Sequence, residues 1–305
     1  MKNKKNYLRS ISVLGIAIML LFSGCENNVE EGTNIIDTLS SDSNFSTLVE
    51  ALQKAEITSY LEDYSPFTVF APTNAAFDEL FSNLGVSSIE DLSSEYLDSI
   101  LYYHILYTEL TSSLFENVYI STLSAGPDLQ GIILLINATE STLNRDVNIT
   151  DFDIKASNGV IHVIDKVLLP PTVVDIVTQN GNFTHFVEAV AKAEMESTLS
   201  GTGPFTIFAP TDEAFEALFT DFGVSGIADL TKEQLIPILQ YHVVDGNMIS
   251  TDMSSGYVST HNGDILVEIG LSVSINSSAN VIGFDLQGKN GVVHVIDEVL
   301  IPGKK

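Results

Sequence analysis

The sequence has 305 residues, enough for two domains of ordinary size. It carries 40 acidic residues against 13 basic ones, which gives a formal net charge of −27. This balance argues against nucleic acid as a partner, because such binding relies on Lys and Arg to neutralise phosphates, and against docking on anionic lipid surfaces. A single cysteine, Cys25, excludes an internal disulfide framework and a cysteine-based zinc site.

Residues 1–24 have the pattern of a signal peptide. Four basic residues within the first nine positions precede an apolar run, 11–22, which is too short to span a bilayer comfortably. The run closes on "LFSGC", which resembles a bacterial lipoprotein signal, and this resemblance implies cleavage before Cys25 and acylation of that cysteine. An ordinary signal peptide or a membrane anchor is the alternative.

The segment 25–33 then forms an acidic tether between the predicted lipid and the first domain. Removing the signal peptide leaves nine basic residues against 40 acidic ones, a formal charge of −31. The acidic residues behind Cys25 resemble the export signals of outer-membrane lipoproteins. We therefore expect a surface-exposed outer-membrane protein that meets the membrane only through its lipid.

Most of the remaining chain is one domain repeated twice. "PFTVFAPTNAAF" begins at Pro66, and "PFTIFAPTDEAF", which shares nine of its twelve letters, begins at Pro204. "NGVIHVIDKVLLP" (158–170) likewise recurs as "NGVVHVIDEVLIP" (290–302). The spacing between copies falls from 138 to 132 residues, so the first copy holds six extra residues, which we place in the loop "SAGPDLQG". We predict domain 1 over 34–170 and domain 2 over 172–302.

The elements of one copy can be predicted in chain order. Apolar residues at helical spacing over 45–52 indicate a helix with one buried stripe. A short β-rich run, "FTVFAPT", follows and stops at a proline, after which Thr73 or Asn74 can cap a second helix. The later part of each copy favours strands, and the apolar run over 159–170 is typical of a strand covered on both faces. Helices early and strands late predict an α+β fold.

These segments resemble the fasciclin domain. "FTVFAPTNAAF", the Tyr-His pair at 103–104, and "NGVIHVIDKVLLP" are similar to that family's signature segments, and all of them recur in the second copy. The resemblance implies two tandem fasciclin-like domains, each a wedge of two β-sheets with packed helices. It also implies a role in cell-surface adhesion or matrix contact.

The resemblance extends to residues that animal members use for integrin contact. These positions make up a set of candidate partner-contact residues: Tyr103, His104, Asp153, Ile154, Tyr241, His242, Asp285 and Leu286. Leu286 departs from the family's Asp-Ile pair, and the chain has no "RGD". His104 and His242 also fall on apolar helix stripes, which is more typical of hydrogen-bonded core residues than of metal ligands. We interpret the set first as fold determinants and second as contact residues.

The sequence contains no motif of the nucleophile-elbow, P-loop, dinucleotide-binding, "HExxH" or EF-hand type. We therefore predict no catalytic residues, no metal site and no cofactor. The leading hypothesis is a non-enzymatic surface lipoprotein whose partner is a protein or an extracellular-matrix component. A glycan-binding accessory lipoprotein of a nutrient-uptake system, and a small-molecule or metal carrier, are the alternatives. The absence of Trp disfavours a glycan, although ten Tyr leave aromatic platforms available.

Overall fold

The computed structural model describes residues 32–63 and 66–303. The predicted signal peptide, the lipidation at Cys25 and nearly all of the tether lie outside the described residues. Residues 33–305 form one compact unit, which holds both predicted domains.

Domain 1 has five α-helices and seven strands among the described residues. Its helices are α1 (Ile35–Ser40), α2 (Ser46–Lys54), α3 (Thr58–Asp63), α4 (Asn74–Leu84) and α5 (Ser94–Tyr103). Its strands are β1 (Phe67–Pro72), β2 (Ile105–Leu106), β3 (Val118–Ala125), β4 (Gly131–Asn137), β5 (Thr142–Leu143), β6 (Val147–Ala156) and β7 (Gly159–Ile164).

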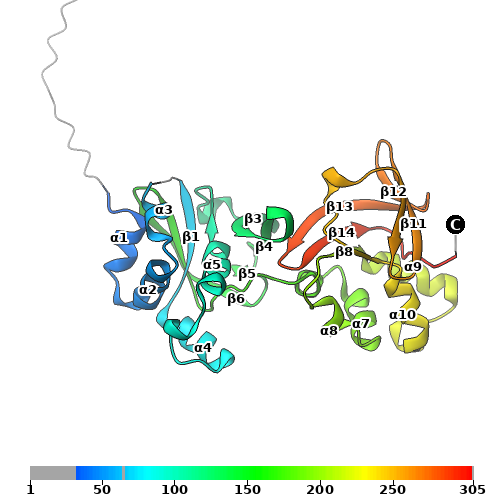
Figure 1. The fold of residues 1–305 in the computed structure, drawn as a ribbon, viewed down its shortest axis with the longest axis horizontal. Coiled ribbons are helices and arrows are strands. Elements are labelled where there is room, and N and C mark those ends of the chain that lie inside the picture. The colour runs from blue at the N-terminus through cyan, green and yellow to red at the C-terminus, as the bar shows by residue number, and fades with distance from the viewer. Residues whose placement is uncertain (1–31, 64–65, 304–305) are drawn as a thin grey trace, which may run out of the picture. The chain divides into compact units, whose positions relative to one another are not determined.

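Domain 2 repeats this order of elements. Its helices are α6 (Val173–Gln179), α7 (Thr184–Lys192), α8 (Glu196–Leu199), α9 (Asp212–Phe222) and α10 (Lys232–Gln240). Its strands are β8 (Phe205–Pro210), β9 (Val243–Asp245), β10 (Gly256–Thr260), β11 (Gly263–Ile269), β12 (Val273–Ile275), β13 (Ala279–Gly288) and β14 (Gly291–Ile296). Figure 1 shows its helices gathered below strands β8, β13 and β14.

The strands of each domain form a seven-stranded sheet, in the order β2-β1-β7-β6-β5-β4-β3 in domain 1 and β10-β11-β12-β13-β14-β8-β9 in domain 2. The α+β class and the two tandem domains are confirmed. The two sheets of the expected wedge are continuous through β6, or through β13 in the second copy. Register shifts in these two strands mark bulges where the sheet bends.

The first and last strands of each domain are parallel neighbours. β1 pairs with β7 over its whole length, from Phe67 opposite Gly159 to Pro72 opposite Ile164, and β8 pairs with β14 in the same way. All six residues of β7 are buried. Helix residues such as Phe77 pack on one side of this strand pair, and residues of β4 such as Leu134 pack with Phe70 on the other. A strand covered on both faces is therefore confirmed.

The helix that follows β1 owes its ends to its local sequence. Thr73 is the N-cap of α4 and its hydroxyl accepts from the backbone N–H of Ala76 at 3.4 Å, as the sequence predicts. Gly85 ends the helix with a φ of 68°, a left-handed conformation that glycine adopts without a steric penalty. The second copy uses Thr211 and Gly223 at the same two positions.

The two domains touch within the compact unit. The Asn180 amide donates to the Tyr119 hydroxyl at 3.0 Å, and Asn247 Nδ2 donates to the carbonyl of Pro127 at 3.3 Å. Pro127 belongs to "SAGPDLQG", which forms the end of β3, a 3-10 turn (Pro127–Leu129) and the start of β4. The loop that domain 2 lacks is therefore one of the segments of domain 1 that contact domain 2.

Candidate binding site

Tyr103 and His104 lie in the core of domain 1, with 0% and 1% of their surfaces exposed. The Tyr103 hydroxyl donates to the carbonyl of Ile133 at 2.8 Å and accepts from Asn144 Nδ2 at 2.9 Å. Since α5 ends at Tyr103 and Ile133 is in β4, this hydrogen bond ties the end of the helix to the far half of the sheet.

The His104 ring is neutral and has a partner at each nitrogen. Its Nε2 accepts from the backbone N–H of Leu168 at 2.9 Å, so the proton lies on Nδ1 and is donated to the carbonyl of Ile100 at 2.8 Å. Burial disfavours the charged ring and lowers the pKa of His104 to about 4. The histidine joins the last turn of α5 to the segment behind β7.

Domain 2 contains the same network. The Tyr241 hydroxyl donates to a carbonyl of β11 at 2.9 Å and accepts from Asn276 Nδ2 at 3.1 Å. The His242 ring forms hydrogen bonds with the carbonyl of Ile238 and with the N–H of Leu300. Burial lowers the pKa of His242 to about 4. Two copies of one buried arrangement indicate that the Tyr-His pair is required by the fold.

Asp153 lies at the bulge of β6, with a φ of 58° that is unusual for a residue other than glycine. Its carboxylate accepts from the backbone N–H of Ser112 at 2.8 Å and from the Ser112 hydroxyl. These two hydrogen bonds lower the pKa of Asp153. Its own N–H donates to His162 Nδ1 at 3.3 Å, and the next residue, Ile154, packs against the helix-side core.

Asp285 and Leu286 repeat this arrangement in domain 2. The Asp285 carboxylate accepts from the N–H of Ser250 at 2.7 Å and from the Ser250 hydroxyl. Its N–H donates to His294 Nδ1 at 3.3 Å, and Leu286 packs against the core of domain 2. In both domains the carboxylate thus holds a loop against the bulged strand.

The candidate residues therefore fall into two internal networks in each domain. The polar atoms described above form hydrogen bonds within the chain. Their geometry therefore shows how these side chains stabilise the fold. Direct contact with a partner stays a prediction for all eight residues.

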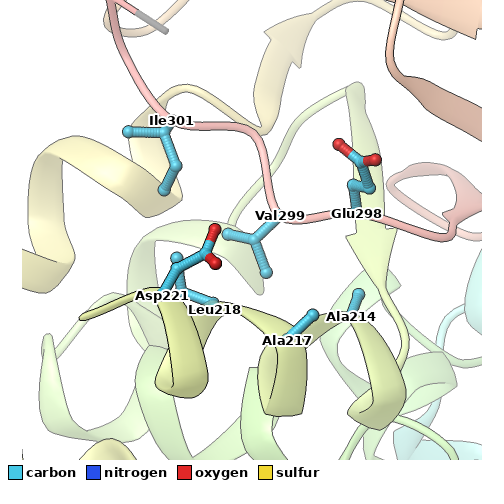
Figure 2. A pocket seen from close by; sticks show the side chains of 7 residues that line it. All are labelled: Ala214, Ala217, Leu218, Asp221, Glu298, Val299 and Ile301. Atoms are coloured by element: carbon cyan, nitrogen blue, oxygen red, sulfur yellow. The ribbon is translucent and has the colours of Figure 1, made fainter. Parts of the chain in front are cut away.

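A cleft occurs at the same place in both domains, between α4 or α9 and the segment after the last strand. In domain 2 it has a volume of about 140 Å³, and in domain 1 about 160 Å³. Figure 2 shows the domain 2 cleft, which is lined by Ala214, Ala217, Leu218 and Asp221 of α9 and by Glu298, Val299 and Ile301. Pockets that enclose small molecules usually measure roughly 300–1,000 Å³, so both clefts are small for that purpose.

A row of aromatic rings on domain 1 was not predicted from the sequence. We call Tyr60, Phe67, Tyr102 and Tyr107 the aromatic row. Tyr60 lies 5.6 Å from Phe67 and 6.3 Å from Tyr102 between ring centroids, and Phe67 lies 5.7 Å from Tyr107. Tyr107 is 56% exposed, and Tyr60 and Tyr102 are partly exposed. The signal that could have revealed it is a comparison of the two repeats, because domain 2 has no Tyr at these positions.

Across residues 32–63 and 66–303, no group of three or more His, Cys, Asp or Glu side chains is placed to hold a metal ion. In that same part of the chain, no helix combines the length and the apolar character needed to cross a membrane.

Comparison with known proteins identifies the repeated domain. The model of the Fasciclin domain matches residues 43–170 and again residues 181–302. A protein of Synechocystis sp. is 40% identical over 134 residues, which make up 43% of this chain and 73% of that protein. Human periostin is 30% identical over 250 residues, covering 79% of this chain and 29% of periostin.

A porcine protein, transforming growth factor-beta-induced protein ig-h3, is 27% identical over 282 residues; the match covers 88% of this chain and 40% of ig-h3. This chain thus spans less than half the length of these two animal relatives. Among solved structures, a FAS1 domain pair from the insect cell adhesion molecule Fasciclin I aligns with a TM-score of 0.48 and 19% identity. That alignment covers 86% of this chain and 98% of the insect chain.

Proposed function

Because the chain belongs to the fasciclin domain family, we propose that it is a non-enzymatic surface lipoprotein that mediates adhesion or binds a protein or matrix partner. The observation that carries the proposal is the presence of two family matches, which together take up most of the chain. Fasciclin relatives such as ig-h3 and periostin support a protein partner in general. The small clefts of both domains favour contact through a surface over enclosure of a small molecule.

The anchoring part of the proposal rests on the sequence around Cys25. "LFSGC" supports cleavage and acylation at this cysteine, and the acidic residues that follow it support display on the outer membrane. We expect intact-mass analysis of membrane-extracted protein to show a chain that begins at an acylated Cys25. The Cys25→Ala chain should be released or remain unprocessed, and an unmodified cysteine in the membrane-extracted protein would contradict the anchor.

Adhesion tests the function itself. Cells that display the chain should adhere to matrix-coated surfaces or to other cells better than cells that lack it, and added protease should both digest the displayed chain and abolish the difference. Equal adhesion with and without the chain would refute the proposed function, whatever the state of Cys25.

A further inference from the structure

The aromatic row differs between the two domains, although the scaffold beneath it is the same. Domain 2 keeps the Phe, as Phe205, but has Thr198, Gln240 and Asp245 where domain 1 has Tyr60, Tyr102 and Tyr107. Domain 2 nevertheless has every strand and α-helix of domain 1 in the same order. The three tyrosines are therefore not needed for the fold.

The tyrosines also give domain 1 a different surface. Phe67 is fully buried beneath Tyr60 and Tyr107, whereas Phe205 is partly exposed and lies 6.4 Å from His261 between ring centroids. Domain 1 thus presents tyrosine rings at a place where domain 2 presents polar groups. Aromatic rings held at a surface offer a partner faces that carry a partial negative charge.

The charges beside the aromatic row also differ between the domains. In domain 2, Glu194 forms an ion pair with Lys232 at the start of α10. Domain 1 keeps the acid as Glu56 but has Ser94 in place of the lysine. It also has Asp98, one turn before Tyr102 on α5, where domain 2 has an apolar residue.

Three carboxylates near the aromatic row of domain 1 consequently lack a cation of their own. None of the ion pairs among the described residues involves Glu56, Glu95 or Asp98. The pKa of Asp98 is raised by partial burial and by the charges of Glu95 and Glu56. Glu95, Asp98 and Tyr102 follow one another at helical spacing, so the charges border the exposed rings.

We propose that the aromatic row and the carboxylates beside it form a docking site for a Lys- or Arg-bearing segment of a protein partner. A guanidinium or ammonium group can lie over a tyrosine face while it pairs with a carboxylate, and this combination suits arginine best. The partner then supplies the cation that Lys232 supplies within domain 2. The net charge of −27 attracts such a segment from solution and repels an anionic glycan. The inference rests on the proposed partner-binding function and names its site and the chemistry of the partner.

The first test is direct binding by the purified full chain in a non-ionic detergent. The probe is a short fluorescein-labelled peptide of alternating Arg and Gly, and its matched control has citrulline, which is uncharged, in place of each Arg. We expect the Arg peptide to bind and to be released by salt, and the citrulline peptide not to bind. No binding of the Arg peptide, equal binding of the two peptides, or its displacement by a neutral oligosaccharide would overturn the proposal.

Two variants locate the site by giving domain 1 the residues of domain 2. Tyr102→Gln removes a ring, and Ser94→Lys supplies an internal cation in the manner of Lys232 without touching the aromatic row. Each should raise the Kd of the Arg peptide by about tenfold. Gln240→Ala, at the corresponding place in domain 2, should leave the Kd unchanged. Unchanged binding by both Tyr102→Gln and Ser94→Lys, with unchanged melting temperatures, would overturn the proposal.

Adhesion separates this inference from the function on which it rests. Failure of the unmodified chain to promote adhesion would refute the function. Undiminished adhesion by cells that display the Tyr102→Gln or Ser94→Lys chain would refute only this site. Reduced adhesion by both variants, together with normal adhesion by Gln240→Ala, is the expected result.

Discussion

His104 and His242 are the residues at which protonation and folding are most closely linked. Each is 1% exposed, and each ring accepts a backbone N–H at Nε2. A proton added at Nε2 would both place a charge in the core and remove the acceptor of that hydrogen bond. The pKa of both histidines in the folded chain is accordingly lowered from 6.5 to about 4.

Stability should therefore fall as the solution becomes acidic. Between about pH 6.5 and pH 4 these histidines bind protons in the unfolded chain but not in the folded chain. The free energy of unfolding therefore decreases as the pH falls through this window. The loss reaches about 3 kcal/mol for each histidine by pH 4. Urea unfolding at a series of pH values measures it. His261→Gln, at a residue on the surface, is the control, and stability that does not change across this window would contradict the assignment.

Replacing either histidine also tests its structural role at neutral pH. His104→Ala and His242→Ala should each lower the free energy of unfolding by roughly 1–4 kcal/mol, because each leaves a cavity and an unpaired backbone N–H. Thermal melting followed by circular dichroism measures this effect. If both variants kept their melting temperature and lost a bound metal instead, the interpretation as core residues would be wrong.

At the scale of elements, the pairing of β1 with β7 depends on one glycine. Gly159 has a φ of 150°, and a Cβ at this position would lie 2.1 Å from the carbonyl oxygen of Phe67. Gly291 faces Phe205 in the same way in domain 2, at 2.0 Å. In each domain the two parallel strands can approach each other this closely only because the glycine has no side chain.

Gly159→Ala should consequently cost about 3 kcal/mol or more, because it adds both backbone strain and a steric clash. The control is Gly85→Ala at the end of α4, where φ is also positive but nothing lies within 4 Å of the added Cβ. That change should cost about 1 kcal/mol. Chemical denaturation compares the two variants, and equal losses would show that the close approach of β1 and β7 is not what requires the glycine.

The elements that local sequence determines were predictable. A cap at Thr73 or Asn74 and a strand covered on both faces within 159–170 were expected from residue type and apolar pattern. The cap is Thr73, and the strand is fully buried but ends at Ile164. The pairing of β1 with β7 could not be predicted from these patterns, because it joins strands from opposite ends of a domain. The hydrogen bonds between Ser112 and Asp153 likewise join distant segments.

The candidate site was less predictable for the same reason. The aromatic row comes from α3, α5, the start of β1 and the residue after β2, so no single stretch of sequence contains it. A resemblance to known proteins draws attention to shared residues such as Tyr103. It gives no weight to Tyr102, which differs between the two domains of this chain.

At the scale of the whole molecule, the join between the domains, "PPT" (170–172), contains Pro170 and Pro171, and both are buried. Two prolines restrict the backbone, and the hydrogen bond between Tyr119 and Asn180 adds a contact close to the join. The two domains should therefore tumble as one body.

Replacing both prolines with glycine should loosen the join and leave each domain folded. Nuclear magnetic resonance relaxation should give one correlation time for both domains of the unmodified chain and two correlation times for the Pro170→Gly, Pro171→Gly chain. Independent tumbling of the domains in the unmodified chain would contradict a stiff join.

The parallel pairing of β1 with β7 also limits how such a chain can change its length over generations. The strand that opens each domain and the strand that ends it are neighbours in the sheet, so a gene fragment that lacks either one encodes no smaller stable piece. The unit that can be gained or lost is therefore the whole domain. A second whole copy can follow the first through a join of only a few residues, as "PPT" (170–172) does here.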